Sequence, residues 1–378
     1  MIKRNIAVLY AVAFLQGMVF YGPIATLYRQ ARGVSVLEIA AIESVSLVLA
    51  LALEVPWGLL ADRIGYRRTL LICNGLFWVS KVVFWQAESC GAFLVERILL
   101  SVVVAGLSGV DTAMLYCSCG GKDSQRVFGM YESLQTAGLL AASVVYAAAV
   151  GERYELAAEL TVVSYGLAAV LTLLLREVQP EKGPASGERK RVWELLAMLK
   201  RPGVLWFLVG AALLQETHQV ITVFLNQLQY ARVGMSAGAM GYAYTAVTVA
   251  GLCGVFSARL TRGLGERRMM YNCCGTAGVA CVLLAVTQNA VVSIVAVLAL
   301  RVSFTLLQPL QTEIRNRQVT GSDRATVLSV QAVVMSSVGA VVNVSFGAAA
   351  ERNLPLAFLL GAALCAFALP LLRHGTTK

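Results

Sequence analysis

Ionisable and amide side chains gather in one short stretch of this otherwise apolar sequence, LLQETHQVIT. The polar residues in it that could do chemistry are expected to crowd into the same helical turn: Gln215, Glu216, His218 and Gln219. A carboxyl and an imidazole can bind and release protons, and the amides can donate and accept hydrogen bonds. Arg301 lies at a similar depth in another apolar segment. The pattern predicts that Glu216 carries protons and that Arg301 is its counter-charge or anchors an anion. The alternative is a buried Glu216–Arg301 salt bridge that only stabilises the fold.

The composition shows what surrounds these residues. Of the 378 residues, 58% are hydrophobic and 14% charged, and the mean hydropathy is +0.71. Soluble domains carry about 25% charged residues, so this chain is expected to lie in a lipid bilayer. Apolar runs of bilayer-crossing length predict twelve helices at 6–27, 37–57, 69–87, 92–115, 127–150, 156–175, 204–225, 236–258, 269–287, 290–310, 325–347 and 354–372. The nine cysteines show no metal-binding or disulfide spacing and read as small hydrophobic residues.

Other polar residues lie inside these segments. Glu43 and Glu54 are close to three helical turns apart, which places both carboxylates on one face, about 16 Å from each other. Because a carboxylate in a membrane is costly unless it faces a cavity or a partner, we expect Glu43 to meet a proton or a ligand and Glu54 to contact the other half of the chain. Gln16 and Tyr21 are expected to line a cavity. Lys81 is expected to extend toward the membrane surface.

The Lys and Arg residues set the expected orientation. With the N-terminus inside, most of the 31 basic residues fall on the cytoplasmic side, as the positive-inside rule requires. Both termini are then cytoplasmic, in what we expect to be a bacterial cytoplasmic membrane. This bias also accounts for the formal charge of +10, so no nucleic-acid partner is expected.

Short motifs recur in order, about two hundred residues apart. The matched pairs are Leu15–Gln16 with Leu214–Gln215, Ala31–Ser35 with Ala231–Ser236, Gly65–Arg68 with Gly265–Arg268, Ser124–Val127 with Ser322–Thr326, and Gly151–Arg153 with Ala350–Arg352. The repeat predicts two six-helix bundles, 1–175 and 204–378, joined by a cytoplasmic linker at 176–203 that ends in an interfacial helix. Parallel repeats of this kind place a binding site between the halves and work by alternating access.

The loop GLLADRIGYRR at Gly58–Arg68 resembles the G-x-x-x-D-R-x-G-R-[RK] signature of the major facilitator superfamily. The resemblance covers nearly the whole chain, although Tyr66 stands where the signature has its first arginine and Arg262 where the second copy would have its aspartate. It implies an all-helical, twelve-span transporter fold. It also implies a conformational latch formed by Gly58, Asp62, Arg63, Gly65 and Arg67. Asp111 at the end of the fourth segment is expected near Arg63 and Arg67 in a charge relay, and Arg97 is either a functional arginine or a surface partner of Glu96.

These observations favour a secondary transporter that exports small amphipathic molecules in exchange for protons. The fifth segment matches the family's antiporter signature, G-x8-G-P-x-x-G-G, only in part. Gly129 and Gly138 keep the spacing of its first two glycines, but Leu139 replaces the proline. The alternatives are a proton-coupled uptake symporter for a small organic ion, and a receptor or scaffold that kept the fold without transport. No nucleotide-binding loop, metal cluster or nucleophile constellation is evident in the sequence, so we expect no enzyme activity and no cofactor. The expected partners are a small-molecule substrate, protons and the lipid bilayer, and the expected state is a monomer.

Overall fold

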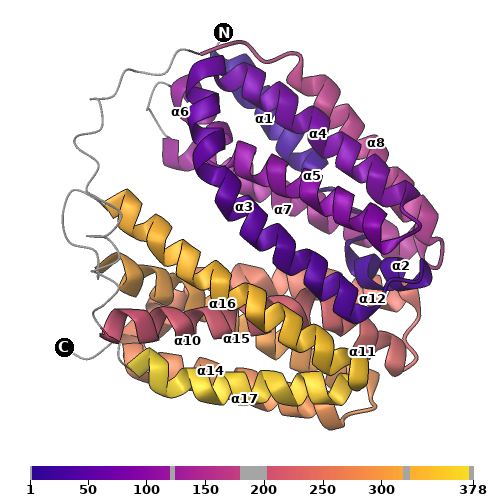
Figure 1. Ribbon diagram of the computed structural model, residues 1–378, viewed down its shortest axis with the longest axis vertical. Coiled ribbons are helices and arrows are strands. Elements are labelled where there is room, and N and C mark those ends of the chain that lie inside the picture. Colours follow the sequence, from indigo (N-terminus) through magenta and orange to yellow (C-terminus); the bar gives the residue numbers. More distant parts are fainter. Residues whose placement is uncertain (1, 120–123, 179–201, 318–323, 374–378) are drawn as a thin grey trace. The chain divides into compact units, whose positions relative to one another are not determined.

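The computed structural model describes residues 2–119, 124–178, 202–317 and 324–373, and the regular elements within these ranges are all helical (Figure 1). In this part of the chain, twelve helices are long and apolar enough to cross a membrane, which confirms the twelve expected segments. The expected interfacial helix of the linker lies outside the described residues.

Two compact units make up the chain. Unit 1 contains Met1–Val34, Val45–Ala185 and Ser236–Thr245, and unit 2 contains Ser35–Ser44, Ser186–Met235 and Ala246–Lys378. The short pieces Ser35–Ser44 and Ser236–Thr245 are the first turns of α3 (Val36–Ile64) and α12 (Ala237–Ala250). Each therefore clusters with helices of the opposite sequence half, and the two pieces occupy equivalent places in the repeat.

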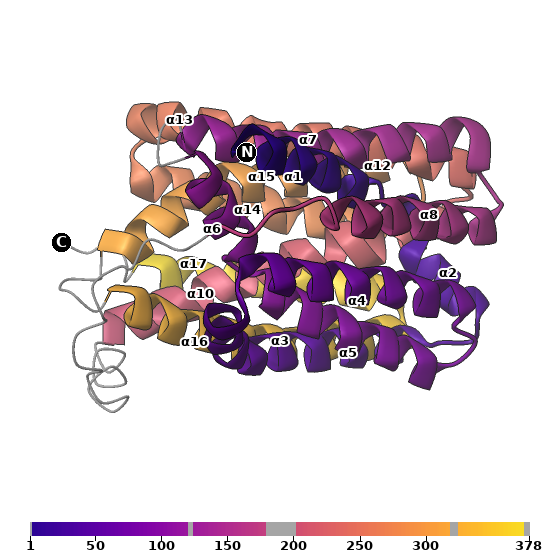
Figure 2. The same ribbon diagram turned by 90° about the horizontal axis from the view of Figure 1, so that it is seen from above.

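Unit 1 is built from the helices of the first sequence half. Besides most of α3, these are α1 (Ile2–Gly17), η1 (Gly22–Ile24), α2 (Ala25–Ala31), α4 (Tyr66–Gln86), α5 (Cys90–Leu107), α6 (Val110–Cys119), α7 (Ser124–Val145), η2 (Tyr146–Val150) and α8 (Tyr154–Thr172). Helix α1 packs mainly on α7 and α8, and α4 packs on α5 and α8 (Figure 2). Glycines let α1 and α7 meet closely, because a Cβ on Gly17 would collide with the carbonyl oxygen of Gln135, and one on Gly138 with that of Phe14.

Unit 2 repeats this plan with the helices of the second half. They are α10 (Pro202–Gln219), η3 (Val220–Leu225), α11 (Asn226–Arg232), the later part of α12, η4 (Gly251–Phe256), α13 (Ser257–Leu264), α14 (Glu266–Val286), α15 (Ala290–Arg317), α16 (Arg324–Arg352) and α17 (Leu354–Arg373). Helix α14 packs on α17 and α15, and α10 packs on α17 and α16. Figure 1 shows α14 lying beside α17.

The same turn appears at matching places in both units. Gly65 precedes α4 with φ 90° and Gly265 precedes α14 with φ 82°. A positive φ of this size is comfortable only for glycine. The sequence repeat around these glycines is therefore also a repeat of backbone conformation.

The first span of each unit is not a continuous α-helix. In unit 1 the α-helix stops at Gly17, an irregular turn follows, and η1 and α2 complete the span. In unit 2 the α-helix stops at Gln219, and a π-helical stretch leads into α11. Gly22 and Pro23 explain the first interruption, since proline removes a backbone donor and glycine weakens a helix. Interrupted spans are where transporters place their binding groups.

Candidate functional site

Glu216 is buried inside unit 2, with 6% of its surface exposed. Its Oε2 accepts a hydrogen bond of 3.0 Å from the side-chain amide of Asn343 on α16. The carboxyl group lies directly on Gly339, where a Cβ would come within 2.9 Å of Cδ. Among the described residues, no Lys, Arg or His nitrogen lies within 4.0 Å of this carboxylate. A Glu216–Arg301 ion pair, one of the two expectations from the sequence, is thus not formed in the described structure.

Arg301 instead lies beside His218. Its Nη1 is 3.5 Å from His218 Nε2, and its guanidinium rests on Gly251, where a Cβ would come within 2.7 Å of Nη2. The imidazole stacks on Phe304 with ring centroids 4.0 Å apart. The physical reason is helical phase: residues 216 and 218 are two positions apart, which turns their side chains to different sides of α10. Counting residues along the spans therefore placed Arg301 at the level of α10 where Glu216 and His218 lie, but it did not predict which of the two it contacts.

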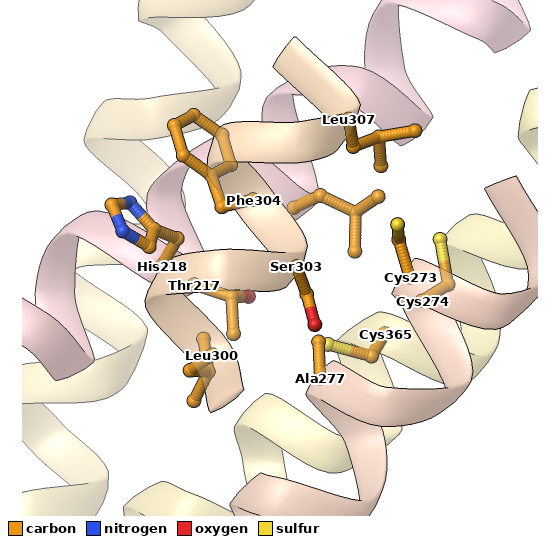
Figure 3. A pocket seen from close by; sticks show the side chains of 11 residues that line it. Thr217, His218, Cys273, Cys274, Ala277, Leu300, Ser303, Phe304, Leu307 and Cys365 are labelled. Carbon is orange, nitrogen blue, oxygen red and sulfur yellow. The ribbon is translucent and has the colours of Figure 1, made fainter. Parts of the chain in front are cut away.

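A small cavity lies next to His218 inside unit 2 (Figure 3). Its wall comes from α10, α14, α15 and α17 and is formed by Leu214, Thr217, His218, Cys273, Cys274, Ala277, Leu300, Ser303, Phe304, Leu307 and Cys365. The Ser303 hydroxyl donates to the carbonyl of Ala299 in its own helix. The cavity therefore offers mainly apolar and thiol surface.

Gln215 and Gln219 do not join the Glu216 cluster. Both side chains are exposed, while Glu216 and His218 are buried. The two glutamines are four residues apart and share one face of α10. The expectation that all four polar residues gather in one place is wrong at these two positions.

The two acids of α3 belong to different units. Glu43 is buried in unit 2, whereas Glu54 is exposed in unit 1. Next to Glu43, the Ser44 hydroxyl donates to the carbonyl of Ala340 on α16 at 3.0 Å. Ala340 adjoins Gly339, on which Glu216 rests, and the Glu43 carboxylate acts electrostatically on Glu216. Two buried acids therefore approach the same stretch of α16.

Gln16 and Tyr21 lie in the interior of unit 1, at the interruption of the first span. Gln16 donates to the side-chain oxygen of Asn74 at 2.5 Å. The Tyr21 hydroxyl accepts a hydrogen bond of 3.0 Å from Lys81 Nζ. Lys81 has only 5% of its surface exposed, so the expectation that it extends to the membrane surface is wrong. Its ammonium lies inside the bundle among the rings of Tyr21, Phe77 and Tyr165, an arrangement that an apolar sequence context does not reveal.

Side chains of α8 complete the interrupted span. Thr161 Oγ1 accepts from the backbone N–H of Phe20 at 3.0 Å. The Ser164 hydroxyl donates to the carbonyl of Leu15, and the Tyr165 hydroxyl to that of Gln16, each at 2.6 Å. Threonine, serine and tyrosine at positions i, i+3 and i+4 share one helix face. Sequence reasoning missed these three residues, although polar residues at helical spacing in an apolar span were the available signal.

The expected latch residues are only partly brought together. The surroundings of Gly58 and the side chain of Asp62 lie outside what the structure describes. Arg63 is exposed. Arg67 Nε donates to the carbonyl of Leu175 at 2.7 Å, and its backbone N–H to Glu177 at 3.2 Å.

Asp111 is not in the expected charge relay. It accepts from the Tyr131 hydroxyl at 3.1 Å and from the backbone N–H of Thr112 at 2.6 Å. Among the described residues neither Arg63 nor Arg67 pairs with it, because the Arg67 side chain runs to the carbonyl just beyond α8. Tyr131 was not singled out from the sequence.

In unit 1, Glu96 forms an ion pair with Arg29 at 3.8 Å, and the neighbouring Arg97 is half-buried.

In unit 2, Arg317 pairs with Glu266 at 2.6 Å and also with Glu313. Both carboxylates hold the pKa of the Arg317 guanidinium above its usual value, so this network, which the sequence did not indicate, stays charged in neutral solution.

The described residues form twelve apolar helices, two units with interrupted first spans, and ionisable groups buried within the spans. Together these features define a polytopic membrane transporter. The chain belongs to the Major Facilitator Superfamily, whose family model matches residues 6–343. The family establishes a multi-pass membrane transporter and not an enzyme.

Solved transporter structures share the fold. The nucleoside transporter NupG matches with a TM-score of 0.82 and 16% identity over 99% of this chain and 100% of that one. A D-xylose–proton symporter matches at 0.74 and 13% identity over 100% and 99%. A bacterial homolog of the human lysosomal transporter Spinster matches at 0.74 and 14% identity over 99% and 95%. No curated protein sequence matches the chain.

Proposed function

We propose that this protein is a proton-driven secondary transporter that exports small amphipathic organic molecules, with Glu216 as the proton carrier. The observation that carries the proposal is the neutral partner of Glu216. Its carboxylate is buried in a span beside the Asn343 amide, and no described cation lies within 4.0 Å. A buried carboxylate without a cation is costly in lipid unless it can take up a proton.

Glu43 strengthens the same argument. It is a second buried acid that acts electrostatically on Glu216. Two carboxylates in one environment favour a state in which one of them is neutral. The Asn343 amide suits both states of Glu216, because its N–H can donate to a carboxylate and also to the carbonyl oxygen of a carboxylic acid. The pair therefore has the chemistry to load and release a proton once per transport cycle.

Export is the direction we propose, with uptake by symport as the alternative. Export is supported by the partial match to the antiporter signature in α7, where Gly129 and Gly138 keep the spacing of its glycines. Symport is favoured by Leu139, which takes the place of the proline in that pattern, and by the resemblance to a D-xylose–proton symporter. We further propose that the Gly58–Arg68 loop is a conformational latch, with Asp62 as its negative charge.

Proteoliposomes that contain a pH-sensitive dye test both the coupling and its direction. Library compounds are added outside, and the dye reports any proton movement that their entry drives. Antiport makes the lumen more alkaline as a compound enters, and symport makes it more acidic. In the Glu216→Gln variant this proton movement should disappear, while exchange of a labelled substrate should survive because glutamine resembles protonated glutamate.

The matched control is Glu159→Gln, which removes an exposed carboxyl group from α8. This variant should keep the proton movement of the unmodified protein. Substrate-driven proton movement in Glu216→Gln would remove Glu216 from the proton path and leave Glu43 as the next acid to test.

A further inference from the structure

Lys81 is a buried cation that lies among aromatic rings in unit 1. Its Nζ lies 5.7 Å from the ring centre of Tyr21, 5.0 Å from that of Phe77 and 5.2 Å from that of Tyr165. Among the described residues, no carboxylate lies within 4.0 Å of this nitrogen. Aromatic faces attract a cation, but each contributes only about 0.5–2 kcal/mol. The buried Glu96 carboxylate acts electrostatically on Tyr21, but it is itself paired with Arg29. The positive charge of Lys81 is therefore held in unit 1 without a carboxylate in direct contact among the described residues.

Tyr21 stands beside this charge with a hydrogen to donate. The Lys81 ammonium donates to the Tyr21 oxygen, so the phenol hydrogen is left for a different acceptor. None of the described residues accepts it. Donation from an ammonium polarises the hydroxyl and makes it a stronger donor, as in other hydrogen-bond chains. Lys81 and Tyr21 therefore present one polarised donor backed by one positive charge.

The backbone around Tyr21 is suited to admit a ligand. Met18–Tyr21 is the irregular turn between α1 and η1, near the middle of the span Arg4–Ala31. Met18 and Val19 are partly exposed, while Tyr21 is buried and stacks on Phe84 with centroids 4.1 Å apart. The α8 hydroxyls hold the end of α1 at Leu15 and Gln16, and the turn itself at Phe20. To meet a ligand at this turn, the buried Tyr21 side chain must move from its stack on Phe84.

We propose that Tyr21 and Lys81 form a binding site for an anionic oxygen group, and that the transported molecule is a small organic carboxylate. Tyr21 contacts the anion, and Lys81 supplies the charge through the Tyr21 hydroxyl. Binding of the anion does not depend on the proposed function, whereas the statement that the anion is the cargo rests on it. The apolar part of the cargo is the amphipathic portion already proposed.

Equilibrium binding tests this site without any proton gradient. Thermal unfolding of the purified protein is followed with a panel of aromatic and aliphatic monocarboxylates, among them benzoate and salicylate, and with the primary amide of each acid. Carboxylates should raise the unfolding temperature and the matched amides should not. The Lys81→Met and Tyr21→Phe variants should bind the carboxylates about tenfold more weakly or worse, since hydrogen bonds to charged groups contribute that much.

Two further variants separate binding from structure. Lys81→Arg keeps the charge and should keep the preference for carboxylates. Tyr165→Phe removes a hydroxyl from the same aromatic group and disturbs the Gln16 carbonyl, yet should also keep the preference. If Lys81→Met does not fold, Tyr21→Phe and Lys81→Arg still decide the matter.

Two results would overturn the site. One is an unfolding temperature of the unmodified protein that carboxylates and amides raise equally, or that neither of them raises. The other is a carboxylate preference that persists in Tyr21→Phe. Loss of proton movement in Glu216→Gln with an unchanged carboxylate preference would support the proton carrier and the anion site independently, because the two assays share no readout.

Discussion

Glu216 and Asn343 face each other across α10 and α16, with the amide nitrogen 3.0 Å from the carboxylate. The same amide nitrogen donates to the carbonyl of Gly339 one turn earlier. Asn343 is therefore oriented by its own helix before it meets Glu216. An oriented neutral donor fixes the position of the acid and leaves its charge uncompensated.

Gly339→Ala should impair coupling without unfolding the protein. A Cβ at this position would lie 2.9 Å from Glu216 Cδ and Oε1, and the end of a flexible side chain can move away. The displaced carboxyl group should lower proton-driven transport by about tenfold, a loss of about 1.4 kcal/mol of transition-state stabilisation. Gly275→Ala is the control, because nothing lies within 4 Å of its Cβ position. Equal transport in both variants would contradict the role given to this contact.

Gly138→Ala should destabilise unit 1, whereas Gly129→Ala should not. A Cβ on Gly138 would meet the backbone carbonyl of Phe14, and the space at Gly129 is open. Overpacking of a close contact costs about 1–3 kcal/mol, and a backbone atom cannot move aside as a side chain can. Thermal unfolding and yield after detergent extraction measure the difference. Similar unfolding temperatures for the two variants would show that α1 and α7 tolerate a wider spacing.

Thr161→Val should lower the unfolding temperature although it keeps the size of the side chain. The variant leaves the backbone N–H of Phe20 without the acceptor it now has, and an unsatisfied buried donor costs about 1–3 kcal/mol. Thr136→Val is the control, because Thr136 is partly exposed and its hydroxyl donates only to the Glu132 carbonyl of its own helix among the described residues. An unchanged unfolding temperature in Thr161→Val would mean that another group replaces the lost acceptor.

Asp62→Asn should reduce transport in intact cells while the amount of protein in the membrane stays the same. A latch that relies on attraction needs the full negative charge, and asparagine keeps the size of aspartate but not its charge. Flux per molecule of membrane protein is the measurement. Turnover equal to that of the unmodified chain would end the latch proposal.

The spans could be predicted from sequence because length and apolarity alone define a membrane helix, and the described structure contains twelve. Which polar side chains contact each other inside the bundles could not be predicted from the sequence. Lys81 and Glu216 each lie in an apolar run, and nothing in such a run tells which helix face meets protein and which meets lipid. The expected depth of Arg301 is correct, but it lies beside His218 and not beside Glu216. Depth follows from the number of residues along a span, whereas the contact depends on the helix face on which each side chain lies. The α8 hydroxyls show in the sequence as polar residues at helical spacing, but their backbone partners are recognisable only once the interruption near Gly17 is known.

The dependence of the first span on α8 has a consequence for how the protein is made. Phe20 and Thr161 are 141 residues apart in the chain, so the ribosome completes α1 on the order of ten seconds before it completes α8. During that interval the Leu15, Gln16 and Phe20 backbone groups lack the partners that α8 later provides, and hydrocarbon offers them none. The first span must therefore wait in a protected or partly hydrated environment until the sixth arrives. A nascent chain that ends before Tyr154 should be recognised by membrane quality control as incomplete.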